Sequence, residues 1–155
     1  MNEMYAMSQS VHIYSVIGLI VVLLFMIAMH KVKGDFEKFV KNIKILMIFH
    51  LSLLGFIVLT GAIMMAVQEA MMTSGADLSI VNQLSFTPAN LLMIVAFFII
   101  SVLEIKRNKA LSKVVKFKLI KEEVYKKLGF RYQLVELFLL ISVSAFSGMS
   151  SAVSF

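Results

Sequence analysis

Four ionisable side chains stand inside, or at the ends of, strongly apolar segments of this sequence. His50 and Glu136 are internal, whereas His30 and Glu104 each close a segment. Imidazole and carboxyl groups exchange protons and bind metal or haem iron. Such a group is costly in an apolar segment and usually faces protein or water. These residues are therefore the first candidates for chemistry.

His50 and Glu136 should lie at a similar depth on different helices. Measured from Lys44 and Arg131, a rise of about 1.5 Å per residue puts His50 about 9 Å and Glu136 about 7.5 Å inside. The pair would serve as catalytic residues of a proton relay, or as a haem or metal ligand with its partner. The alternative is that Glu136 reaches the interface beside Arg131 or Tyr132, while a neutral His50 bonds a backbone carbonyl.

All three histidines, His12, His30 and His50, are candidate cofactor ligands, with haem b as the cofactor. His30 follows His12 by about 27 Å of helix, and no two of the three match closely in depth. A haem held by two histidines of one chain is therefore not expected. A haem held by His50, alone or with a ligand from another subunit, stays open, as does the absence of any cofactor.

A second candidate site is formed by methionines at the start of the chain. Met1, Met4 and Met7 are spaced by three and are followed by His12. Thioethers are soft ligands that suit Cu(I), so Met4, Met7 and His12 form a candidate copper site. The alternative is that these methionines only fill space in apolar helices.

Other classes of site are excluded by composition. The chain has no cysteine, which excludes disulfide scaffolds, thiolate metal sites and c-type haem attachment. The GxSxG, P-loop, GxGxxG and HExxH signatures of soluble enzymes do not occur. Whether the chain is an enzyme stays open.

The elements that must position these residues are membrane helices. The chain has 155 residues, of which 60% are hydrophobic and 15% charged, which is too apolar for one soluble core. Four segments approach the length of a spanning helix: about 11–29, 45–67, 88–105 and 134–155. The third reaches full length only if Lys106 and Arg107 extend to the interface. We expect a single membrane domain, 1–155, that is an all-α bundle of four transmembrane helices.

The distribution of charge predicts orientation. All 15 Lys and Arg fall between the first and second segments or between the third and fourth. The positive-inside rule puts both regions in the cytoplasm and both termini outside, in the cytoplasmic (inner) membrane of a bacterium. The net charge of +6 therefore reflects topology, and a nucleic-acid partner is not expected.

Each basic region carries a helix signal. In the first, Gly34-Asp35 breaks the helix and Asp35 can cap a new one, whose apolar face would lie on the inner leaflet. That face comprises Phe36, Phe39, Val40 and Ile43. In the second, a basic amphipathic helix is expected from the N-cap Ser112 to Gly129, with lysines that face anionic lipid or a docked partner. These lysines are Lys113, Lys116, Lys121 and Lys127.

The fourth segment is rich in small residues. Ser144, Gly148 and Ser151 line one stripe, which allows close helix packing. The stripe would serve packing within the bundle or against a homo- or hetero-oligomeric membrane partner.

The layout resembles the HemJ-type protoporphyrinogen oxidases and the CopD-type copper proteins. The resemblance rests on His12, His30, and Phe130-Arg131 with Glu136 soon after. It implies a haem- or porphyrin-linked redox function. The alternatives are a non-catalytic accessory subunit of a larger membrane complex and copper handling through the methionines.

Overall fold

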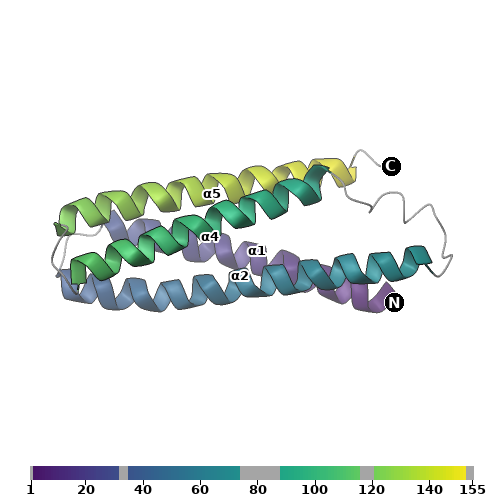
Figure 1. Cartoon of the computed structure of the whole chain (residues 1–155), viewed down its shortest axis with the longest axis horizontal. Helices are drawn as coiled ribbons and strands as arrows, with labels where there is room; N and C mark the ends of the chain where they lie inside the picture. Colours follow the sequence, from purple (N-terminus) through teal and green to yellow (C-terminus); the bar gives the residue numbers. More distant parts are fainter. Residues whose placement is uncertain (1, 32–34, 74–87, 116–120, 153–155) are drawn as a thin grey trace.

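The residues that the structure describes form four helices lying side by side (Figure 1). The computed structural model describes residues 2–31, 35–73, 88–115 and 121–152. The helices are α1 (Asn2–Lys31), α2 (Phe36–Thr73), α4 (Pro88–Val115) and α5 (Glu122–Ala152). The all-helical class expected from the sequence is confirmed.

Three of the helices are long and apolar enough to cross a membrane. The qualifying stretches are Glu3–Lys31, Phe36–Val67 and Glu122–Phe146. The apolar run of α4 ends at Glu104 and spans about 24 Å from Pro88, less than the roughly 30 Å of a hydrocarbon core. The surface of the bundle is apolar, with Tyr14 and Phe138 more than 70% exposed. These features are those of a membrane protein.

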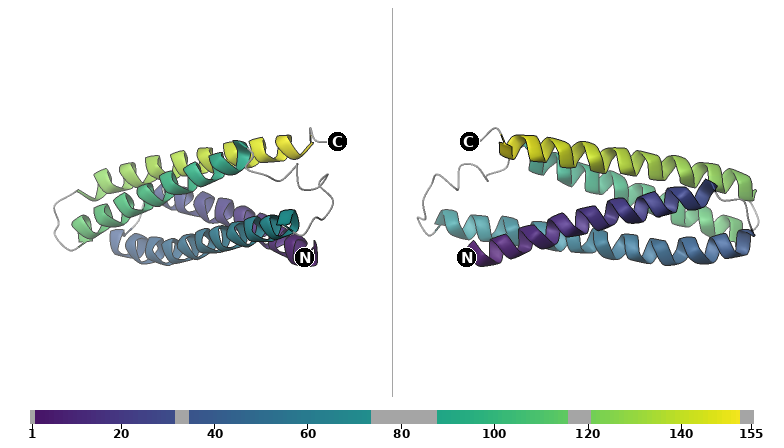
Figure 2. Two further views of the ribbon diagram at one scale, coloured as in Figure 1. Left: turned by 45° about the vertical axis from the view of Figure 1, so that its right-hand side comes forward. Right: turned by 180° about the vertical axis from the view of Figure 1, so that it is seen from behind.

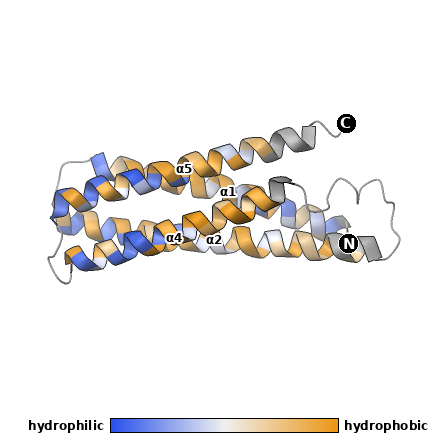
Figure 3. Cartoon of the chain, turned by 45° about the horizontal axis from the view of Figure 1, so that its top comes forward, coloured by the Kyte–Doolittle hydropathy of each residue, from blue (hydrophilic) through white to orange (hydrophobic). Residues whose placement is uncertain are grey.

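The two ends of the bundle differ in polarity. Hydrophilic residues gather where α1 and α4 end and where α2 and α5 begin (Figure 3). We call this the basic end; its exposed cations include Lys31, Lys38, Lys113 and Lys127. Helix α1 packs against α2 and α5, and α4 packs against α5. Helix α1 crosses α2 obliquely (Figure 2).

The start of α2 follows the sequence prediction in part. Asp35 caps the helix, since its side-chain oxygen accepts a hydrogen bond from the Glu37 backbone N–H at 3.0 Å. The expected position of the apolar face was wrong. Phe39, Val40 and Ile43 are buried in the core, because α1, α4 and α5 all reach far enough to cover them.

The ends predicted for a separate helix in the second basic region were also wrong. Ser112 lies inside α4 and Gly129 inside α5, so neither ends a helix. The physical reason is core packing, because Val114 and Tyr125 are buried with Phe39 and extend both helices into this region. Of the four lysines, Lys113, Lys121 and Lys127 are exposed, and Lys116 lies outside the described residues.

At the end opposite the basic end, fewer of the sequence predictions can be compared with the structure. Helix α4 begins at Pro88, where the third apolar segment was expected to begin, and proline is favoured at the first helical position. Residues 74–87 lie outside the described residues. So do the side chains of Gly148 and Ser151, and the small-residue stripe stays a prediction.

The described residues form two apolar cores. The larger, at the basic end, includes Met26, Phe39, Ile43 and Tyr125. The smaller consists of Leu19, Leu54 and Ile100, with Leu140 packed against it. The candidate site lies between the two cores.

Candidate functional site

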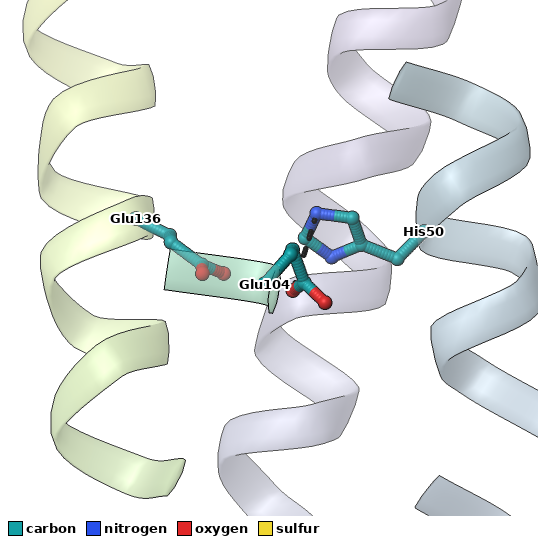
Figure 4. A group of neighbouring side chains, drawn as sticks. All are labelled: His50, Glu104 and Glu136. Carbon is teal, nitrogen blue, oxygen red and sulfur yellow. Dashed lines mark ion pairs between the residues drawn. The ribbon is translucent and has the colours of Figure 1, made fainter. Parts of the chain in front are cut away.

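A cluster of polar side chains occupies the middle of the bundle. It consists of His50 on α2, Glu104 and Arg107 on α4, and Gln133 and Glu136 on α5. Glu104 is 4% exposed, and the other four are fully buried. His50, Glu104 and Glu136 point toward one another, with α1 behind them (Figure 4). We call these five residues the polar cluster.

Helical spacing places the five side chains. Glu104 and Arg107 are three residues apart on α4, as Gln133 and Glu136 are on α5, and residues at this spacing share a helix face. Helices α2, α4 and α5 each carry an apolar residue of the smaller core one turn from the cluster, on the side away from the basic end. These are Leu54, Ile100 and Leu140.

Arg107 holds Glu104. Its Nη2 donates a hydrogen bond to Glu104 Oε2 at 2.6 Å, the short distance of a charge-assisted bond, and lies 2.6 Å from Oε1 in the same ion pair. His50 Nε2 lies 3.6 Å from Glu104 Oε1, which is too long for a hydrogen bond. Glu104 is thus fixed by its own helix and faces the imidazole without bonding it.

Several cluster atoms have no hydrogen-bond partner in the part of the chain that the structure describes. They are both oxygens of Glu136, both ring nitrogens of His50, both amide atoms of Gln133, and Nε and Nη1 of Arg107. Buried polar atoms rarely stay unpaired in folded proteins. The cluster therefore has the capacity to bind a small polar species, such as a proton, water or a cation.

A metal ion is one such species. One ligand atom from each of His50, Glu104 and Glu136 lies within 4.8 Å of the other two. Imidazole and carboxylate suit several divalent metals. A divalent ion beside two carboxylates and the Arg107 guanidinium would leave one net positive charge buried. The charge balance therefore favours a proton over a divalent metal.

The depth argument from the sequence correctly brings His50 and Glu136 together. The alternative for Glu136 was wrong, because its carboxyl is fully buried and does not reach the interface. Arg107 was also expected at the interface, and it is fully buried because Glu104 neutralises it inside the bundle. Gln133 was missed; its position three residues before Glu136 was the available signal.

The other two histidines lie at other levels of the bundle. The Thr60 hydroxyl donates to the Phe56 carbonyl and accepts from His12 Nδ1 at 3.0 Å. His30 Nδ1 donates to the Met26 carbonyl at 2.7 Å, and its ring packs edge-on against Phe39.

Helix α2 gives the spacing of these levels. His50 is about 16 Å of helix from Phe39 and about 15 Å from Thr60. The structure therefore brings no two of the three histidines onto one haem iron.

The methionine site is not assembled in this chain. Met4 and Met7 are 53% and 71% exposed, whereas His12 faces Thr60 on α2. Met4 and His12 are also about 12 Å apart along α1. The three candidate copper ligands thus do not converge.

Comparisons with known proteins add no further constraint. No protein-family model, no curated protein and no solved structure matches this chain. The functional conclusion therefore rests on the polar cluster and its surroundings.

Proposed function

We propose that this chain is a proton-transfer protein of the membrane, in which the polar cluster takes up and releases one proton. The observation that supports this most directly is the charge of the cluster. Two buried carboxyl groups, Glu104 and Glu136, share the site with one guanidinium, that of Arg107. With a neutral His50, the ionised cluster would carry one uncompensated negative charge.

An uncompensated charge in a nonpolar interior is expensive. One bound proton removes it. Glu136 is the natural carrier, since Arg107 contacts Glu104 and neither oxygen of Glu136 has a partner among the described residues. His50 is close enough to exchange that proton, because its ligand atom lies within 4.8 Å of both carboxyls.

The proposal includes a location and an orientation. We place the bundle in the cytoplasmic membrane of a bacterium with the basic end inside and both termini outside. The support is the confinement of all 15 Lys and Arg to segments that meet at that end. The apolar surfaces of α1, α2 and α5 would then face lipid.

Infrared spectroscopy of the purified protein in lipid tests the proton directly. A protonated carboxyl group has a carbonyl stretch separate from that of a carboxylate. We expect this band at neutral pH, and we expect it to disappear in Glu136→Gln. The matched control is Glu37→Gln, which changes an exposed carboxyl on α2 and should leave the band intact. A wild-type protein without the band would contradict the proposal.

A second candidate function is haem-linked redox chemistry with His50 as the axial ligand. It is favoured by one observation, that both ring nitrogens of this buried histidine lack hydrogen-bond partners in the described part of the chain. An absorption spectrum of the gently purified protein, oxidised and then reduced, is the test. A Soret band that is lost in His50→Ala and kept in His12→Ala would support haem. A colourless protein would remove this candidate and leave the proton proposal standing.

A further inference from the structure

One face of α5 carries a buried polar stripe that leads from the basic end to the polar cluster. Its members are Tyr125, Gly129, Gln133 and Glu136, all of them buried. Spacings of four, four and three residues keep them on one face of the helix. The stripe covers about 16 Å of helix. It therefore joins the cluster to the charged end of the bundle along a single helix.

In the opposite direction the cluster is followed by apolar side chains. Leu54, Ile100 and Leu140 stand one turn beyond the cluster on their helices, and Leu19 of α1 packs with them. None of these side chains can donate or accept a proton. Of the buried polar side chains in the described residues, Arg107 and Gln133 adjoin the cluster on its basic-end side, whereas Ser15 and Thr60 lie beyond the apolar residues on the opposite side. The surroundings of the cluster are thus asymmetric along the bundle axis.

His30 meets the stripe midway. Its Nδ1 is bonded to the Met26 carbonyl, and a carbonyl can only accept, so Nδ1 carries the hydrogen and Nε2 is left as an acceptor. Nε2 is buried and has no partner among the described residues. A Cβ built on Gly129 would stand 2.5 Å from Nε2. Glycine at this position therefore lets the imidazole lie against α5.

The stripe has further polar atoms on either side of His30. The Tyr125 hydroxyl and both amide atoms of Gln133 are buried and lack partners in the described chain. They lie about 6 Å of helix on either side of Gly129, a distance that one or two water molecules can bridge. Two cations also face this region: Arg107 of α4 is buried, and Lys126 of α5 lies 5.0 Å from the Phe39 ring centre.

We infer that protons reach the polar cluster from the basic end, through a path formed by Tyr125, His30 and Gln133 with bridging water. The inference rests on the proposed function, because it supplies the route to the proton on Glu136. In each passage His30 Nε2 takes a proton from water on the Tyr125 side. The same atom returns it to water on the Gln133 side, which passes it to Glu136. His30 ends as it began, and no other reactant is needed.

Deuterium exchange of the Glu136 carboxyl band tests the path. After transfer of the lipid-embedded protein to deuterated buffer, the band shifts at the rate at which the carboxyl exchanges. A positioned proton-transfer group contributes about 100-fold or more to proton transfer. We therefore expect exchange to slow by about 100-fold in His30→Phe and in Gln133→Leu. The second variant keeps the test available if the first does not fold.

Glycine variants provide the matched control. Gly129→Ala should slow exchange, because the added methyl displaces His30 from the stripe, whereas Gly55→Ala meets nothing within 4 Å and should not. If His30→Phe and Gln133→Leu both keep the band and exchange at the wild-type rate, the path is overturned and the proposed function still stands. A wild-type protein without the band would instead overturn the proposed function, and the path with it.

Discussion

At the scale of single residues, Arg107 shows how one partner decides where a charge can lie. It is fully buried, and its Nη2 contacts both oxygens of Glu104. Removing one member of a buried ion pair leaves the other as an uncompensated charge. Removing both charges avoids this cost.

We therefore predict unequal effects of single and double substitutions at this pair. Arg107→Met should lower the free energy of unfolding by about 3 to 5 kcal/mol. The double variant Arg107→Met with Glu104→Gln should recover much of that loss. The measurement is unfolding of the purified protein in mixed micelles. Arg131→Met, at an exposed position on α5, is the control. A double variant as unstable as Arg107→Met would contradict a paired role for the two charges.

The same residues show what sequence reasoning could and could not predict of the site. The depth of each residue along its own helix was enough to predict that His50 and Glu136 lie close together, because an ionisable residue inside an apolar segment is easily recognised. Arg107 was read as an interfacial cation because it stands in a Lys-rich run. Its burial depends on which face of α4 turns inward, and that is set by packing against α5, which the spacing of charges does not reveal.

At the scale of elements, the helix boundaries with a local chemical signal were predicted best. Asp35 and Pro88 mark the starts of α2 and α4 as the sequence indicated. The extensions of α4 and α5 beyond the apolar segments were missed. They depend on nonlocal packing, in which Val114 and Tyr125 contact a core that α2 also lines.

The Asp35 cap leads to a prediction for α2. Asp35→Ala removes the acceptor for the Glu37 N–H and should lower the free energy of unfolding by about 1 kcal/mol. Asp35→Asn keeps a capping oxygen and should restore most of the loss. Lys38→Ala, an exposed site one turn along, serves as control in the same unfolding titration. Equal stability of Asp35→Ala and Asp35→Asn would show that the cap does not stabilise α2.

At the scale of the whole molecule, the orientation of the bundle decides which side of the membrane the proposed proton path would serve. The stripe of α5 runs toward the basic end, whereas apolar side chains pack on the Leu54 side of the cluster. If the basic end is cytoplasmic, the cluster exchanges protons with the cytoplasm and not with the outside. The orientation of the bundle therefore decides what the polar cluster can do in a cell.

Orientation can be measured by cysteine labelling, since the chain has no cysteine of its own. Glu3 near the start of α1 and Lys38 at the basic end are both exposed, so a single cysteine at either site perturbs little. With the basic end inside, a membrane-impermeant maleimide should label Glu3→Cys in intact cells. It should label Lys38→Cys only after the membrane is permeabilised, which also shows that this cysteine is reactive. The reverse pattern would place the basic end outside and would assign the proton path to the external solution.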